Sequence, residues 1–302
     1  MTTPNTRFPP TIYVLHAVLL WSTGGLFIKL TSFDAFAVNL GRSLFAAIVV
    51  GLLTYKRGLR LDAFTLFTSF LYAGTLTAFV YATKNTTAAN AIFLQYTAPI
   101  YILILSPFIL GERFHFADLI TVAVCLAGMS LFFVDAPNAA NTLATNIFAG
   151  NVAALISGVF FGLYFIFLRH PRSLQKNPAL SVFYGNIIVV LVMLPLITAN
   201  PPGTVTFMDV ASILYLGVFQ IGIAYLLFTW GMAAGVRSMD ASIIGFIEPL
   251  FNPIWVFLFV GERPSRWAII GGVIIIGAVA FHTIAQQRRK KVTGPEVTGH
   301  QV

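Results

Sequence analysis

A series of long apolar stretches constrains this chain more than any other feature of its sequence. A helix needs about 20 apolar residues to cross a bilayer core, and short polar or Pro/Gly-containing turns separate stretches near that length along most of the chain. In lipid the backbone must satisfy its own hydrogen bonds, which favours helices. We therefore predict an all-α integral membrane protein with ten transmembrane helices, at residues 12–30, 35–54, 63–83, 87–110, 115–134, 147–168, 179–198, 208–232, 239–260 and 266–285.

The composition agrees with a chain that lies in lipid. Of its 302 residues, 58% are hydrophobic and only 9% are charged, which is too apolar for an ordinary soluble domain. The net charge of +8 does not indicate nucleic-acid binding, because four basic residues form one run, 288–291, just after the last apolar stretch, where they would face anionic lipid. The single cysteine, Cys125, excludes a disulfide within the chain.

Lysine and arginine are distributed unevenly between the predicted loops. If the N-terminus is cytoplasmic, the inner loops and tails hold thirteen basic residues and the outer loops hold four, which satisfies the positive-inside rule. We expect both termini to be cytoplasmic and the protein to lie in a bacterial inner membrane. The polar segment 286–302 contains Gly294, Pro295 and Gly299, and we expect it to be a disordered cytoplasmic tail.

An internal repeat predicts how the ten helices are organised. At an offset of 150 residues the chain aligns with itself over about thirty residues, and the shared features are Pro99 with Pro249, Gly111-Glu112-Arg113 with Gly261-Glu262-Arg263, and the small pair Ala127-Gly128 with Gly277-Ala278. Residues 12–134 and 147–285 then form two repeats of five helices each. Five is an odd number, so the second repeat must be inverted relative to the first, which is typical of secondary transporters.

The motifs within these repeats resemble a known family. The residues concerned are Leu94-Gln-Tyr-Thr-Ala-Pro99 followed by Gly111-Glu112, Ile247-Glu-Pro249 followed by Gly261-Glu262, and the stretch from Trp21 to Lys29. Over residues 12–285 the chain resembles the EamA-type members of the drug/metabolite transporter superfamily. The resemblance implies two inverted repeats, a central substrate cavity, and exchange or efflux of small metabolites such as amino acids or drug-like compounds. Phe160-Phe161-Gly162 departs from the tryptophan or small residue that many members have there, so no cavity lining is carried over at that point.

Glu248 is the carboxylate that lies deepest within a predicted helix. A charge at that depth is costly, so it usually faces a cavity or a partner. One interpretation is a residue that couples transport to protons or binds a cation. The other is a hydrogen-bonded glutamate that stabilises the helix where Pro249 breaks it.

Proline residues predict breaks in the fourth and ninth helices. Pro249 and Pro253 each lack an amide donor, which leaves the carbonyls of Gly245 and Pro249 without helical partners. Such carbonyls either bind a polar substrate at the midplane or simply accompany a kink. Pro99 is the counterpart in the first repeat.

Polar and aromatic residues near these breaks form the candidate substrate cavity. We predict that it is lined by Trp21, Tyr81, Gln95, Tyr96, Pro99, Tyr164, Glu248, Asn252 and Trp255. The alternative for each aromatic ring is ordinary packing or an interfacial belt. Arg42, the one basic residue well inside a helix, either holds a substrate carboxylate, pairs with Glu248, reaches the outer interface or bonds to loop carbonyls.

The sequence offers no enzyme signature. P-loop, His-Glu-x-x-His and Gly-x-Ser-x-Gly motifs are all missing, and we expect no catalysis, no cofactor and no metal. The predicted function is a permease that exports amino acids or related compounds by alternating access, with protons or a counter-substrate as possible partners. It would act in the bilayer as a monomer or homodimer, without nucleic acid. An uptake carrier of the same fold, a membrane scaffold and an intramembrane enzyme are the alternatives.

Overall fold

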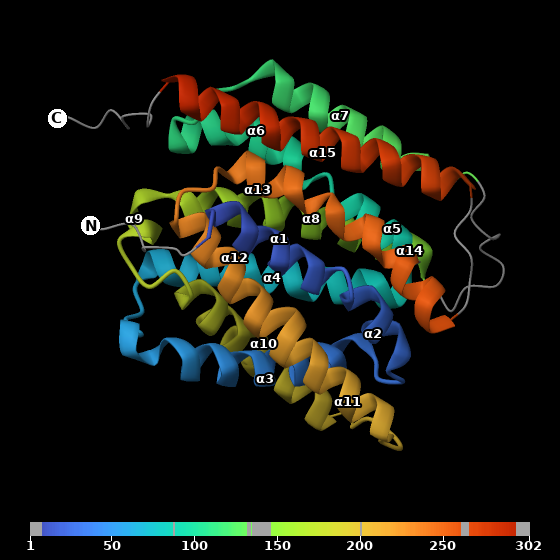
Figure 1. Ribbon diagram of the computed structural model, residues 1–302. Helices are drawn as coiled ribbons and strands as arrows, with labels where there is room; N and C mark the ends of the chain where they lie inside the picture. The colour runs from blue at the N-terminus through green and yellow to red at the C-terminus, as the bar shows by residue number, and fades with distance from the viewer. Residues whose placement is uncertain are drawn as a thin grey trace.

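The computed structural model describes residues 8–86, 88–131, 134, 146–199, 201–260 and 266–293, and the secondary structure in these ranges is entirely helical. The helices pack side by side in an elongated bundle (Figure 1). The first half contains α1 (Pro10–Trp21), α2 (Gly24–Leu30), α3 (Ala35–Thr54), the short η1 (Tyr55–Arg57), α4 (Ala63–Asn85), α5 (Ala88–Gln95), α6 (Ala98–Leu110) and α7 (Phe116–Ser130).

The second half repeats this pattern. It contains α8 (Ile147–Arg169), α9 (Pro171–Leu174), α10 (Leu180–Ala199), α11 (Phe207–Tyr215), the π-helical η4 (Leu216–Ile223), α12 (Ala224–Ala233), α13 (Ser238–Gly245), α14 (Ile247–Val260) and α15 (Arg266–Thr293). Within the described ranges, eight helical runs are long and apolar enough to cross a membrane, and α7 is a shorter apolar helix. With the α13–α14 pair these make ten helical segments, five in each half, which confirms the predicted fold class.

The two halves run in opposite directions. We call the end where α1 begins and α15 finishes the termini end, and the opposite end the far end; they lie at the left and right of Figure 1. The first helical segment, α1–α2, runs from the termini end to the far end, whereas α8 runs from the far end back to α9 at the termini end. The repeat is therefore inverted, as the odd number of helices requires.

Two broken helices, one from each half, meet in the middle of the bundle. The α5–α6 break lies at Tyr96 and Thr97, and the α13–α14 break lies at Phe246. Tyr96 and Phe246 are separated by the repeat offset, and their ring centroids lie 5.1 Å apart. Pro99 and Pro249 follow three residues after these positions, and each withholds the amide that would continue the helix.

Glycine residues on α8 allow the broken α5–α6 pair to come close. A Cβ on Gly158 would lie 2.7 Å from Thr97 Oγ1 and 2.9 Å from the carbonyl oxygen of Gln95, and one on Gly162 would lie 2.9 Å from the carbonyl oxygen of Ala98. Only glycine permits such contact between backbones. The segment that departs from the family pattern therefore packs directly against the central break.

The expectation of a disordered tail from residue 286 is wrong for its first part. Helix α15 continues to Thr293, past the change from apolar to polar sequence. The residues from Gln286 to Lys291 are good helix formers, and a change of polarity does not by itself end a helix. Residues 294–302 lie outside the described residues.

Candidate functional site

Glu248 lies at the centre of the bundle, where the two broken helices meet. Its Oε2 accepts a hydrogen bond of 2.9 Å from the hydroxyl of Tyr96, and the two residues are 6% and 4% exposed. The same hydroxyl bonds to the carbonyl oxygen of Gly245. This is the carbonyl that Pro249 deprives of its helical partner, so a side chain of the first repeat satisfies the break in the second.

Gln95 and Pro99 lie on the other side of this centre. The amide of Gln95 donates to Ser157 Oγ at 2.7 Å, and Ser157 donates to the carbonyl oxygen of Thr75 at 2.9 Å. This chain of bonds joins α5, α8 and α4. Pro99 is buried at the start of α6. The residue that meets Glu248 is therefore Tyr96 rather than Gln95.

A group of packed rings, which we call the aromatic cluster, lies beside the centre. Its members are Trp21, Tyr72, Phe161, Tyr164, Tyr225 and Phe228, all buried. The Tyr225 ring lies 4.7 Å from Trp21 and 4.8 Å from Tyr72 between centroids. The hydroxyl of Tyr164 lies 3.1 Å from Ser181 Oγ. Trp21 and Tyr164, both predicted, thus belong to one cluster with Tyr225.

Trp255 and Tyr81, two further predicted site residues, contact other parts of the bundle. Trp255 on α14 donates its ring N–H to Ser22 Oγ at 2.9 Å, at the break between α1 and α2. Tyr81 is half-buried on α4 against the hydrophobic core. Asn252 belongs to α14, and its side chain lies outside the described part of the structure.

Arg42 is fully buried on α3, so it does not reach the outer interface. One terminal nitrogen, Nη2, donates to Leu76 O at 3.0 Å and to Asn39 Oδ1 at 3.2 Å. Among the described residues no carboxylate forms an ion pair with it, and its Nε has no hydrogen-bond partner. Neither pairing with Glu248 nor bonding to a loop carbonyl is seen; the carbonyl that it binds belongs to α4.

A second group of ionisable residues, the termini-end network, consists of Asp118, Arg237, Asp240 and His282. Arg237 lies 3.0 Å from Asp118 and 3.8 Å from Asp240, and His282 lies 3.7 Å and 3.2 Å from the same two carboxylates. These residues join α7 of the first half to α13 and α15 of the second. Burial opposes the charge on Arg237, but the carboxylates of Asp240, Asp118 and Glu112 outweigh it and raise the pKa of Arg237.

Sequence reasoning missed this network. Asp118 and Asp240 each lie near the start of a predicted helix, and His282 lies near the end of one. Taken singly, each resembles an interface residue. The signal that was present is topological, because the predicted orientation of the ten helices brings all three to the same end of the bundle.

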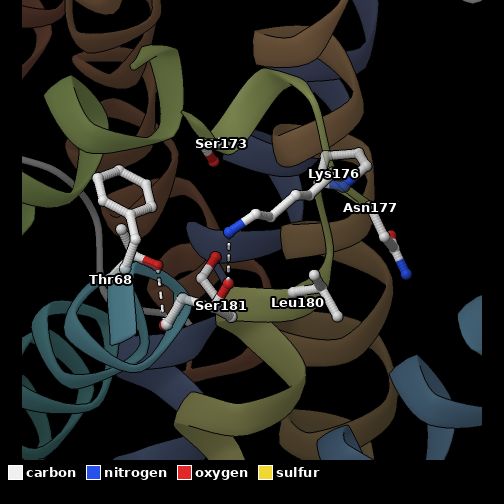
Figure 2. Close-up of a pocket in the computed structure, with 9 residues that line it drawn as sticks. Thr68, Ser173, Lys176, Asn177, Leu180 and Ser181 are labelled. Carbon is white, nitrogen blue, oxygen red and sulfur yellow. Dashed lines mark hydrogen bonds between the residues drawn. The ribbon is translucent and has the colours of Figure 1, made fainter. Parts of the chain in front are cut away.

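A small hollow also lies at the termini end, between α4 and the segment that leads into α10 (Figure 2). Lys176 reaches across it, pairing with Asp62 and lying 3.5 Å from Thr65 Oγ1. The hydrogen bonds from Lys176 and Thr65 hold the pKa of Asp62 well below its usual range. The volume of the hollow is about 10 Å³, which is close to the need of a single water molecule and too little for a metabolite.

Comparison with known proteins identifies the family. The model of the EamA-like transporter family matches residues 9–134 and again residues 148–284. The chain belongs to the EamA-like transporter family. This confirms the resemblance carried by the broken-helix motifs, and it makes the protein a membrane transporter by family.

Relatives of this EamA-like protein carry transporter names. A protein of Archaeoglobus fulgidus named an uncharacterized transporter is 26% identical over 276 residues, covering 90% of this chain and 95% of that one. A probable terminal-alkyne amino-acid exporter of Streptantibioticus cattleyicolor is 26% identical over 69% of this chain and 68% of its own length. The pseudopaline exporter CntI of Pseudomonas aeruginosa is 27% identical over 72% of each.

A solved crystal structure shares the EamA-like fold. It superposes with a TM-score of 0.79 at 21% sequence identity and covers 94% of this chain and 100% of that one. At this identity the likeness concerns the fold alone. In the described part of the chain, no group of three or more His, Cys, Asp or Glu residues is arranged to hold a metal ion.

Proposed function

We propose that this protein is a secondary transporter that exports amino acids or closely related metabolites by alternating access, and that Glu248 exchanges a proton during the cycle. The observation that carries the proposal is the position of Glu248. It is buried between two inverted, broken helices, where transporters of this architecture bind their substrates. The name of the amino-acid exporter among the relatives supports the substrate class, and the names of both exporters support the direction.

The hydrogen bonds around Tyr96 support a protonated Glu248 in this conformation. A phenol has one proton to donate, yet the Tyr96 hydroxyl faces both the Gly245 carbonyl and Glu248 Oε2. If Glu248 carries a proton, it donates to the phenol oxygen and Tyr96 donates to Gly245, so every group is satisfied. Without that proton, Glu248 would be a buried negative charge whose one donor, the Tyr96 hydroxyl, is also needed by the Gly245 carbonyl. Burying a charge with so little hydrogen bonding is costly.

The termini-end network supports a cycle in which the two halves separate at one end. Its charges tie α7 of the first half to α13 and α15 of the second. With both termini cytoplasmic in a bacterial inner membrane, as the distribution of basic residues favours, this network would close the cytoplasmic side. Opening that side requires these ion pairs to break. The proposed transporter acts without catalysis, as a monomer or homodimer.

Transport by purified protein in liposomes tests this proposal. We expect uptake of a labelled amino acid to be stimulated by a pH gradient in the wild type. Glu248→Gln should remove this dependence on pH, because glutamine cannot release a proton. Asp62→Asn, which changes an exposed carboxylate, is the control and should keep it. An unchanged pH dependence in Glu248→Gln would rule out the coupling role.

The direction of transport needs a separate measurement. Counterflow of the same amino acid is measured in vesicles sorted by protein orientation, with the pH gradient imposed in either direction. Exchange that moves substrate toward the face opposite the termini supports export. Faster movement toward the termini face would support the uptake carrier, and flux no greater than in protein-free liposomes would leave only a non-transporting role.

A further inference from the structure

Arg42 is a buried positive charge that no carboxylate in the described part of the chain neutralises. It lies seven residues after the start of α3, roughly 10 Å into the helix at 1.5 Å per residue. Its two acceptors, Asn39 Oδ1 and Leu76 O, are both neutral. Among the described residues no carboxylate lies within ion-pair distance of it. Guanidinium groups inside a membrane are expensive unless they meet an anion, so an anion is expected here for part of the transport cycle.

The surroundings of Arg42 offer further unused polar atoms. Asn186 Oδ1 and Ser43 Oγ are buried without hydrogen-bond partners among the described residues, as is Arg42 Nε. Asn186 donates to the hydroxyl of Tyr72 at 3.0 Å, and Tyr72 lies one helical turn before Leu76, whose carbonyl oxygen accepts from Arg42. Buried polar atoms are normally satisfied. Buried polar atoms without partners on α3 and α10, Arg42 Nε among them, indicate a place for a polar ligand.

Tyr72 belongs to the aromatic cluster, so this cluster extends to the part of α4 that Arg42 contacts. Tyr225 is a buried member of the same cluster. Its ring packs on Trp21 and against Tyr72. An amino acid carries a carboxylate that suits the guanidinium, an ammonium group, and a side chain that packs well against aromatic rings when it is apolar.

We propose that Arg42 binds the carboxylate of the transported amino acid. The carboxylate accepts hydrogen bonds along the edge of the guanidinium that carries Nε, in the side-on geometry common between arginine and carboxylates. The ammonium group faces Glu248, which releases its proton when the ammonium arrives, so one positive charge replaces another. An apolar side chain lies among the rings of the aromatic cluster. The ammonium half of this arrangement rests on the function proposed above; the carboxylate half rests on Arg42 alone.

Four small probes separate the two halves of the arrangement. They are L-phenylalanine, L-phenylalaninamide without the carboxylate, phenylacetate without the ammonium, and phenethylamine without the carboxylate. Each is titrated into purified protein, and its dissociation constant is measured. In the wild type we expect phenylalanine to bind about 100-fold more tightly than its amide, because the amide leaves a buried guanidinium unpaired.

Variants at Arg42 then show whether this residue causes the preference for phenylalanine over its amide. Arg42→Gln should weaken phenylalanine and phenylacetate while leaving phenethylamine nearly unchanged, so the ratio of acid to amide falls to within about 3-fold. Arg42→Lys keeps the charge without the side-on geometry and should give an intermediate ratio. Lys84→Gln is the control, since Lys84 is a partly buried cation that, like Arg42, donates to a backbone carbonyl, that of Thr31. It should keep the full ratio.

The outcomes distinguish the two proposals. If wild-type protein binds phenylalanine and its amide with equal affinity, the role of Arg42 is overturned. This comparison needs no variant, so the test holds even if Arg42→Gln does not fold. If Arg42→Gln keeps the large preference for phenylalanine over its amide, the role of Arg42 is also overturned. If phenylacetate binds through Arg42 but phenylalanine does not, the carboxylate site stands and the amino-acid substrate class falls. If no carboxylate probe binds, the site is overturned.

Discussion

Two arginines, Arg42 and Arg237, are both withdrawn from solvent, yet their surroundings differ completely. Arg237 lies beside Asp118 and Asp240, and His282 contacts both carboxylates. Arg42 is more deeply buried and has only neutral acceptors among the described residues. A cation that holds a structure together has its counter-charge within the fold. A cation that serves a ligand leaves part of its hydrogen-bonding capacity free.

The largest effect on stability should come from breaking the termini-end network. Asp118→Asn removes the carboxylate that lies 3.0 Å from Arg237, and it leaves this partly buried guanidinium with the longer contact of 3.8 Å to Asp240. We expect a loss of about 3 kcal/mol in the free energy of unfolding, measured by denaturant titration in detergent. Asp62→Asn, at the same end but exposed, is the control. A loss as small as that of the control would mean that the network does not hold the halves together.

Arg42→Gln should change stability much less than Asp118→Asn does. It removes an uncompensated charge, and the amide of glutamine remains able to donate a hydrogen bond. We expect a change of less than about 1 kcal/mol in either direction, from the same titration. A loss equal to that of Asp118→Asn would make Arg42 a structural brace and would remove the contrast between the two arginines.

The smallest effect should come from the exposed pair of Asp62 and Lys176. Because the pKa of Asp62 is depressed in the folded protein, its contribution to stability is present above the ordinary carboxyl pKa of about 4. That contribution falls as the pH drops below this value. Asp62→Asn should therefore lower the unfolding temperature slightly at pH 7, less in high salt, and the difference from the wild type should shrink toward pH 3. A difference that grows as the pH falls would contradict this sign.

The sequence was sufficient for the fold because its signals are local. Apolar runs predict the helices, and the repeat around Pro99 and Pro249 predicts the inverted halves. Proline chemistry also indicated that the carbonyl of Gly245 would lack a helical partner, and Tyr96 now bonds to it. The Asp118–His282 contacts were not predictable in the same way, since their partners are far apart in the chain.

The environment of Arg42 was equally beyond sequence reasoning. A basic residue seven positions into a helix can extend to the membrane interface or turn inward, and packing decides between the two. Here Arg42 is fully buried and donates to the carbonyl oxygen of Leu76 on α4. The helical extension to Thr293 was missed for a simpler reason, because polarity marks the edge of the membrane and not the end of a helix.

Proton release on substrate binding tests the central claim most directly. Purified protein in weak buffer with a pH indicator dye is titrated with L-phenylalanine, while binding is followed in parallel. If the ammonium group displaces the proton of Glu248, the released protons should rise and saturate together with binding, and Glu248→Gln should bind without releasing any. Binding by the wild type without proton release, or equal release from Glu248→Gln, would contradict the account.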